Sequence, residues 1–322
     1  MNIKQFNLDG ENCYRLENEY LDVILTSTGA GIYSLKFLNR PMTIVPKEMK
    51  EYLISDGYYG KSIGRIAGRL RDGILSYKGK DYQISQNEGK KSLHGGINGF
   101  SHRVFSSRIE NDFVVFSLDS ENGDNGYPGK LHLEVSYTLR DNSLFVIFTS
   151  VSDSDTPVNF TNHSYFSLDE DSCKDLTLYL ASSKAMDYDD ALIPTGLVDN
   201  NETMDFLKPK KIGQDIDNPY LYKTPTKGYD HYFLLDKKVE NQADIILESK
   251  NIKMEIGTTF PGAQIYTGNY YPENLTNNRD KKFVQNHSVA IEPEYCPFDY
   301  DSMTSYANKK KENVIRYTFN KK

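Results

Sequence analysis

The sequence predicts an all-β protein, built as a large sandwich or barrel of antiparallel strands. The chain of 322 residues contains 24 Tyr and 16 Phe but no Trp, and aromatic residues favour strands. Short apolar runs recur along it, separated by turn-forming residues. No segment carries an apolar repeat of 3.6 residues over three or more turns, which disfavours an α/β fold.

The clearest strand is Leu131–Leu139. Its odd-numbered residues are Leu, Val and Tyr, whereas its even-numbered residues are mostly polar, which is the period of a half-buried strand. Arg140-Asp141-Asn142 then predicts a hairpin turn into a second strand, Ser143–Val151. The other expected strands are Tyr20–Leu25, Ile32–Phe37, Phe113–Leu118, Leu176–Leu180, Ile245–Leu247, Ile252–Ile256, Val289–Ile291 and Val314–Phe319. Because no proline-rich or low-complexity linker divides the chain, we expect one domain over residues 1–322.

Charge and composition exclude several classes of partner. Lys and Arg number 38 against 45 Asp and Glu, and this net charge of −7 provides no basic surface for nucleic acid or an anionic membrane. No stretch has the roughly 18 apolar residues of a membrane helix, and the N-terminal segment does not resemble a signal peptide. Cys13, Cys173 and Cys296 are isolated, which favours a reducing cytoplasm over a disulfide scaffold or a cysteine zinc site.

The sequence lacks a complete nucleotide-binding motif and a metal-binding arrangement of histidines. Gly60-Lys61-Ser62 resembles the end of a P-loop, but that motif requires a glycine where Ser55 stands. The six histidines do not have the spacing of a metal triad. We therefore expect neither a nucleotide nor a metal, nor any other cofactor.

His94 and His163 stand in the most informative contexts of the six histidines. His94 precedes Gly95-Gly96, which permit close approach of the backbone, although a tight turn with an incidental histidine is an equal alternative. If residues 159–166 form a strand, His163 shares a face with Tyr165, where an imidazole can donate a proton near neutral pH. A hydrogen-bonded core histidine is the alternative there. Structural or surface roles are expected for His102, His132 and His287.

Three carboxylates are candidates for acid–base chemistry. Asp230 precedes an apolar run and is either a turn acid at a strand start or a site residue. Glu292 follows Val289-Ala290-Ile291, so partial burial would raise its pKa and suit a general base. Glu294 lies on the same side if the strand continues past Pro293, and the local sequence does not choose between the two glutamates.

From about residue 25 onwards the sequence resembles the aldose 1-epimerases (galactose mutarotases), in eight segments that follow the family's order. They are Gly64-Arg65-Ile66-Ala67-Gly68-Arg69, Leu93-His94-Gly95-Gly96 with Gly99-Phe100, Gly126-Tyr127-Pro128-Gly129, Asn162-His163-Ser164-Tyr165-Phe166, Ile193-Pro194-Thr195-Gly196, Asp230-His231, the run 261–269 (PGAQIYTGN), and Ile291-Glu292-Pro293-Glu294. The resemblance implies a single-domain β-supersandwich with an open sugar cleft. It also implies an isomerase that interconverts the α and β anomers of free hexoses such as galactose or glucose.

The resemblance also implies roles for individual residues. His163 looks like the general acid that protonates the ring oxygen, and Glu292 like the base that deprotonates the anomeric hydroxyl. The positions that match sugar-holding residues of the family are Arg69, His94, Asp230 and Gln264. The chemistry agrees, because opening and closing a hemiacetal requires one acid and one base and no redox step.

The chain departs from the family pattern at several positions. Gly68 stands where an Asn is common, which removes one hydroxyl contact. Glu294 replaces a frequent Gln, and a carboxylate there would raise the pKa of Glu292 by repulsion if the two are close. Since Trp is absent, Tyr165 and Tyr266 are expected to cover the apolar face of a pyranose.

Other functions remain as alternatives. One is a sugar-binding β-sandwich without turnover, and another is an epimerase of a different aldose or of a hexose phosphate. A retaining glycosidase would use Asp230 and Glu292 with carboxylates about 5–5.5 Å apart. The expected partner is a small monosaccharide. The sequence leaves open the preferred sugar and the oligomeric state, a homodimer included.

Overall fold

The computed structural model describes residues 1–223, 227–236, 243–271 and 274–322. Strands dominate these residues, and the two α-helices among them are short, α1 (Met49–Ile54) and α2 (Tyr300–Met303). Within the same residues, no helix is long and apolar enough to cross a membrane.

The largest sheet has nine antiparallel strands in the order β11-β12-β13-β14-β28-β24-β23-β18-β21. It contains the predicted hairpin, in which Arg140 pairs with Ser143 across a turn where Asp141 adopts a φ of 49°. Its strands are β11 (Ser106–Glu110), β12 (Phe113–Ser120), β13 (Leu131–Arg140), β14 (Ser143–Ser152), β18 (Thr177–Leu180), β21 (Lys210–Lys211), β23 (Ile245–Glu248), β24 (Ile252–Thr258) and β28 (Lys311–Lys321). Every strand predicted for this part of the chain is confirmed, with ends that differ by a few residues.

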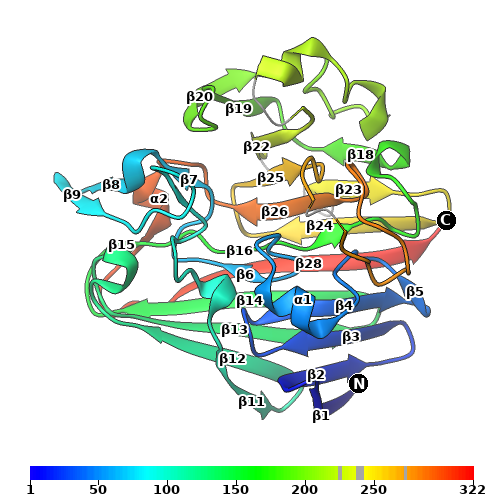
Figure 1. Ribbon diagram of the computed structural model, residues 1–322, viewed down its shortest axis with the longest axis horizontal. Coiled ribbons are helices and arrows are strands. Elements are labelled where there is room, and N and C mark those ends of the chain that lie inside the picture. The colour runs from blue at the N-terminus through cyan, green and yellow to red at the C-terminus, as the bar shows by residue number, and fades with distance from the viewer. Residues whose placement is uncertain (224–226, 237–242, 272–273) are drawn as a thin grey trace.

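Two smaller sheets pack against one face of the nine-stranded sheet (Figure 1). One has five strands in chain order: β1 (Asn2–Leu8), β2 (Glu11–Glu17), β3 (Leu21–Thr26), β4 (Gly31–Phe37) and β5 (Arg40–Pro41). The other has the order β17-β26-β25-β22-β19-β20, with β17 (Tyr165–Phe166), β19 (Lys184–Tyr188), β20 (Pro194–Asp199), β22 (Asp230–Leu234), β25 (Gly262–Tyr266) and β26 (Val289–Glu294). Short two-stranded sheets complete the fold: β6 (Ser62–Ile63) with β16 (Thr161–Asn162), β7 (Arg69–Leu70) with β10 (Ser92–Leu93), β8 (Ile74–Tyr77) with β9 (Lys80–Gln83), and β15 (Thr156–Pro157) with β27 (Thr304–Ser305).

The core lies between these layers. Val135 of β13, Val23 of β3 and Ile291 of β26 are fully buried members of one apolar cluster, although they come from three different sheets. The alternation that predicts β13 from sequence is therefore the alternation between this core and solvent. The all-β prediction is confirmed, and of its two forms the sandwich is correct and the barrel is wrong.

One predicted strand is interrupted. Residues 159–166 do not form a continuous strand, because Thr161–Asn162 pairs with β6 whereas Tyr165–Phe166 pairs with β26. Local side-chain bonds compete with the ladder at this crossing: the Ser164 hydroxyl donates to Asn162 Oδ1 at 2.6 Å. His163 therefore lies between two sheets rather than within one. It still shares a side with Tyr165, and their ring centroids are 4.9 Å apart.

Candidate active site

A cavity of about 230 Å³ lies over one face of the six-stranded sheet. Alternate residues of neighbouring strands face it, because side chains of a strand point to opposite sides in turn. These residues are Tyr165 of β17, Glu292 and Glu294 of β26, Gln264 and Tyr266 of β25, Asp230 of β22 and Tyr188 of β19. Their neighbours Ile291, Ile265 and Phe233 point the other way, into the main core. One sheet therefore supplies both the cavity wall and part of the core.

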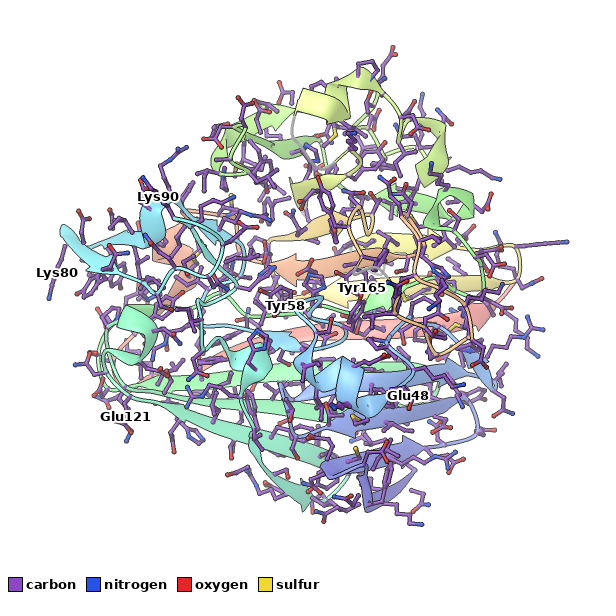
Figure 2. All side chains as sticks on the ribbon, viewed as in Figure 1. Glu48, Tyr58, Lys80, Lys90, Glu121 and Tyr165 are labelled. Carbon is purple, nitrogen blue, oxygen red and sulfur yellow. The ribbon has the colours of Figure 1, made fainter. Side chains whose placement is uncertain are left out.

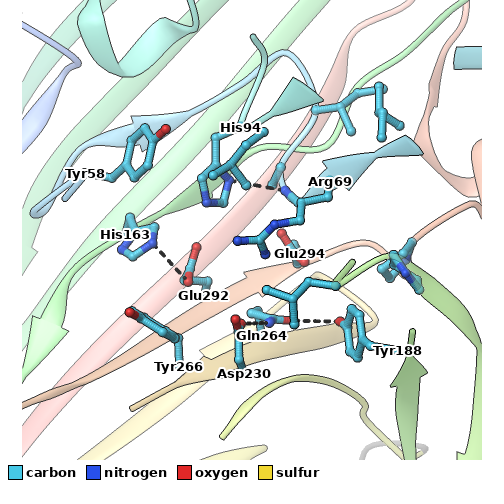
Figure 3. A pocket seen from close by; sticks show the side chains of 18 of the residues that line it. Tyr58, Arg69, His94, His163, Tyr188, Asp230, Gln264, Tyr266, Glu292 and Glu294 are labelled. Atoms are coloured by element: carbon cyan, nitrogen blue, oxygen red, sulfur yellow. Dashed lines mark hydrogen bonds and ion pairs between the residues drawn. The ribbon is translucent and has the colours of Figure 1, made fainter. Parts of the chain in front are cut away.

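The opposite wall is formed by segments outside that sheet. Arg69 lies on β7, His94 follows β10, and His163 occupies the crossing between β16 and β17. All six residues that the sequence places in the site line this one cavity: Arg69, His94, His163, Asp230, Gln264 and Glu292 (Figure 3). The predicted cleft lining by Tyr165 and Tyr266 is also confirmed.

His163 and Glu292 form a buried pair at the cavity wall. His163 Nε2 lies 3.4 Å from Glu292 Oε1, and their side chains are only 5% and 3% exposed (Figure 3). Burial strongly raises the pKa of Glu292, and the carboxylates of Glu294 and Asp230 raise it further. Burial lowers the pKa of His163 to about 4. An acid–base pair is thus held in a desolvated site.

Glu294 faces the same cavity, because β26 continues through Pro293, which is the condition under which the sequence places it on the side of Glu292. Within the described residues, its carboxylate has neither a hydrogen bond nor an ion pair. Burial and then the charge of Asp230 raise the pKa of Glu294 to about 8. The expected effect of Glu294 on the pKa of Glu292 is confirmed in direction.

This raised pKa predicts a pH-dependent stability difference between the protein and its Glu294→Gln variant. Between the ordinary glutamate pKa of 4.5 and the folded value of about 8, the folded protein binds a proton that the unfolded chain releases. Stability from this group is therefore present at low pH and lost as pH rises across that window. The melting temperature of the variant should exceed that of the wild type by a margin that grows from pH 5 to pH 8. Thermal melts that give a constant margin would contradict the prediction.

Asp230, Gln264 and Tyr188 form a hydrogen-bond chain along the sheet. Gln264 Nε2 donates to Asp230 Oδ1 at 2.6 Å, and the Tyr188 hydroxyl donates to Gln264 Oε1 at 3.1 Å. Both ends of the Gln264 amide are therefore fixed in orientation. Asp230 is the first residue of β22, so it is both the expected strand-start acid and a cavity residue.

The turn at His94 explains its glycine neighbours. Gly95 has a φ of 95°, and a Cβ at that position would clash with the Gly64 carbonyl oxygen. The backbone N–H of Gly68 donates to His94 Nδ1 at 3.2 Å, so the proton of the neutral ring resides on Nε2. Burial, then His163 and Arg69, keep the pKa of His94 well below its usual value. His94 is thus a neutral N–H donor, and the turn and site interpretations both hold.

Three participants are missing from the sequence-based prediction. The Tyr58 ring lies 4.8 Å from that of His94 and 5.8 Å from that of His163, and Figure 2 places it near the centre of the molecule. Tyr188 orients Gln264, and Glu88 binds the guanidinium of Arg69. No motif marks these three residues, and the only sequence signal for the two tyrosines is the general excess of Tyr.

His102, His132 and His287 lie outside the cavity lining, as predicted. His132 is exposed and bonds to Asp119, and His287 is buried in a loop beside Phe283. His102 is half-buried, with its ring 5.8 Å from that of Tyr58. In the part of the chain that the structure describes, no group of three or more His, Cys, Asp or Glu residues is arranged to hold a metal ion.

Comparison with known proteins identifies the family of the chain. A family model described as aldose 1-epimerase matches residues 12–313. The galactose mutarotase of Sus scrofa is 31% identical over 296 residues, covering 88% of this chain and 85% of that protein. The aldose 1-epimerase of Escherichia coli K12 is 31% identical over 251 residues, covering 74% and 71%. The crystal structure of galactose 1-epimerase from Lactobacillus acidophilus NCFM superposes with a TM-score of 0.86 at 25% identity, covering 99% of this chain and 98% of that one.

Proposed function

The chain belongs to the aldose 1-epimerase family and is a mutarotase, and on that premise we propose that His163 and Glu292 are its general acid and general base. The observation that carries this assignment is the separation of 3.4 Å between His163 Nε2 and Glu292 Oε1. The anomeric hydroxyl and the ring oxygen of an aldose are bonded to the same carbon, so an acid and a base that serve them must also be neighbours.

Ring opening follows from this placement. Glu292 accepts the proton of the anomeric hydroxyl while His163 donates a proton to the ring oxygen, and the bond between C1 and that oxygen breaks. The aldehyde turns about the C1–C2 bond. His163 then takes back the proton of the hydroxyl that closes the ring, and Glu292 returns its proton to the new anomeric oxygen, so both groups end as they began.

The pair carries one exchangeable proton during turnover. Before substrate binds, the raised pKa of Glu292 and the lowered pKa of His163 keep this proton on the glutamate. Catalysis requires it on the imidazole. The positive charge of Arg69 and a hydrogen bond from the anomeric hydroxyl to the carboxylate both favour that arrangement. Losing this proton or gaining a second one stops turnover, so kcat/KM has a bell-shaped pH profile whose limbs belong to the pair.

The remaining cavity residues hold the sugar in this proposal. Arg69 and His94 supply N–H donors, while Asp230 accepts and Gln264 is fixed beside it. Tyr266 and the other cavity tyrosines cover the apolar face of the ring. Hydrogen bonds from these residues to the sugar hydroxyls would fix the reacting carbon against His163 and Glu292.

A free hexose suits this cavity better than a hexose phosphate. Three carboxylates line it, from Asp230, Glu292 and Glu294, and its arginine is already paired with Glu88. A phosphate group would therefore find no unpaired Lys or Arg among the described residues that line the cavity. Galactose is the sugar named for several relatives, and we propose it, with glucose, as a substrate of this chain.

Three further predictions concern the domain organisation, the cellular location and the oligomeric state of the protein. We propose one domain over residues 1–322, and a cytoplasmic location, for which the three free cysteines are the supporting observation. A homodimer stays a prediction left open by the sequence.

Polarimetry of freshly dissolved α-D-galactose and α-D-glucose tests the proposed substrates. The rate of approach to the equilibrium rotation should rise in proportion to protein concentration, above the spontaneous rate. No acceleration for these two sugars, together with acceleration for a hexose phosphate, would replace the proposed substrate class. Release of product from a chromogenic glycoside would instead favour the glycosidase alternative.

A further inference from the structure

Arg69 is clamped along one edge of its guanidinium. Its Nε donates to Glu88 Oε2 at 2.8 Å and its Nη2 donates to Glu88 Oε1 at 3.0 Å. Two parallel charge-assisted bonds of this kind fix the plane of the guanidinium as well as its position. An arginine has five N–H donors, so three remain for other partners, including both on Nη1. Arg69 lines the cavity, whereas Glu88 lies behind it and does not.

Glu88 is itself held by the turn in which it stands. Lys91 Nζ lies 2.9 Å from Glu88 Oε2 and also donates to the Ala191 carbonyl oxygen at 2.9 Å. The backbones of Glu88 and Lys91 exchange hydrogen bonds of 3.0 and 3.1 Å across the turn. Figure 2 shows Lys90, within this turn, at the margin of the molecule. The turn therefore reaches from the rim of the fold to the back of Arg69.

The contact to Ala191 joins this turn to a distant segment that also borders the cavity. The Asp189 carboxylate accepts hydrogen bonds from the backbone N–H groups of Ala191 and Ile193, at 2.9 and 3.0 Å, and pairs with Arg71. Leu192 of the same segment lines the cavity. The ammonium group of Lys91 thus connects the turn that carries Glu88 to the segment that carries Leu192. This connection limits the movement of Glu88.

The charges inside the cavity show why such a clamp matters. Asp230, Glu292 and Glu294 are all buried, and each in its ionised form would attract an unpaired guanidinium. An ion pair between Arg69 and one of them would consume the donors meant for the sugar. It would also lower the pKa of Glu292, since Arg69 already acts on it in that direction. Glu88 supplies a balancing negative charge outside the cavity.

We propose that Glu88 is a positioning residue that acts through Arg69, holding the guanidinium so that its free N–H groups face the sugar. This inference rests on the proposed sugar-binding role of Arg69. It makes Glu88 a determinant of sugar affinity, although Glu88 does not line the cavity.

The test compares Glu88→Gln and Arg69→Met singly and together, by steady-state polarimetry with galactose. Glu88→Gln keeps the size of the side chain but removes one acceptor and the charge. KM should rise about threefold to tenfold, the scale of ordering one long side chain on binding, while kcat changes less. The acid limb of the kcat profile should move to lower pH, because a freed Arg69 stabilises ionised Glu292. In the Arg69→Met background, Glu88→Gln should cause no further rise in KM.

A matched control is available on the five-stranded sheet. Arg15 and Asp22 form a bidentate pair, with Nε–Oδ1 and Nη2–Oδ2 distances both 2.8 Å, and neither residue lines the cavity. Asp22→Asn should leave KM unchanged. Glu88→Asp, which keeps the charge but shortens the reach, provides a second variant and should raise KM without moving the acid limb.

The outcomes separate this inference from the proposed function. If Arg69→Met raises KM and Glu88→Gln does not, the inference is overturned and the sugar-binding role of Arg69 stands. If the effects of the two substitutions on KM are additive, Glu88 acts independently of Arg69 and the inference is also overturned. If Arg69→Met leaves KM unchanged, the proposed role of Arg69 fails first and removes the basis of the inference.

Discussion

Replacing Glu292 by glutamine is expected to lower kcat for mutarotation by about 100-fold or more, the usual scale of one lost proton transfer. The amide has the shape of the carboxyl group but does not accept the proton of the anomeric hydroxyl. Glu292 lies in the middle of β26, paired with Gln264 across the sheet, so a side chain of equal size leaves the ladder intact. Initial rates by polarimetry, with the far-ultraviolet circular dichroism spectrum as a check of folding, measure the effect.

Glu294→Gln is the comparison that makes this result informative. Glu294 faces the same cavity from the same strand, but no contact of its carboxylate with His163 is found among the described residues. Its replacement should lower kcat far less than the Glu292 replacement. If Glu292→Gln remains active and Glu294→Gln does not, the base has been assigned to the wrong glutamate.

Replacing His163 by asparagine is expected to have an effect of similar size, again about 100-fold or more in kcat. The amide donates hydrogen bonds but does not release a proton to the ring oxygen at any pH of interest. KM should change less than kcat, because the other cavity residues still hold the sugar. The pH profile provides an independent measurement: the residual activity should lose its bell shape and keep a single limb, because only Glu292 of the pair still titrates.

His287→Asn is the matched control for that substitution. His287 is a buried histidine like His163, but it stands in a loop and does not line the cavity. The two variants lose a similar side-chain volume from a buried position, so both report how much a smaller side chain there lowers the stability of the fold. Only His163→Asn also removes the proposed proton donor. Comparable losses of kcat in the two variants would show that packing, rather than proton transfer, explains the result.

The strands were predictable because their signal is local. In β13 the residues that face the core and those that face outward alternate by one position, and this pattern is readable without knowing the partner strands. The segment 159–166 shows where this fails. Its alternation is correct for His163 and Tyr165, but the two halves pair with different sheets. Strand pairing depends on residues that are distant in the sequence, and the alternation within one strand carries no information about them.

The residues of the candidate site also fall into two groups, those that the sequence marks and those that only the tertiary structure reveals. The family motifs mark Arg69, His94 and His163, and the apolar run before Glu292 indicates a buried carboxyl group. Glu88 carries no such mark, since it stands in a polar turn of ordinary composition. Its importance arises only when the antiparallel pairing of β7 with β10 brings that turn behind Arg69.

The sequence by itself determined the strand periodicity, the residue types of the site and the reaction class that those types support. The tertiary structure alone decided which glutamate lies 3.4 Å from His163, and which acid holds Arg69. The physical reason is that a carboxylate becomes a base or an anchor through its surroundings. The burial, neighbouring charges and hydrogen-bond donors that set its pKa and its partners come from β7, β22 and β26 together.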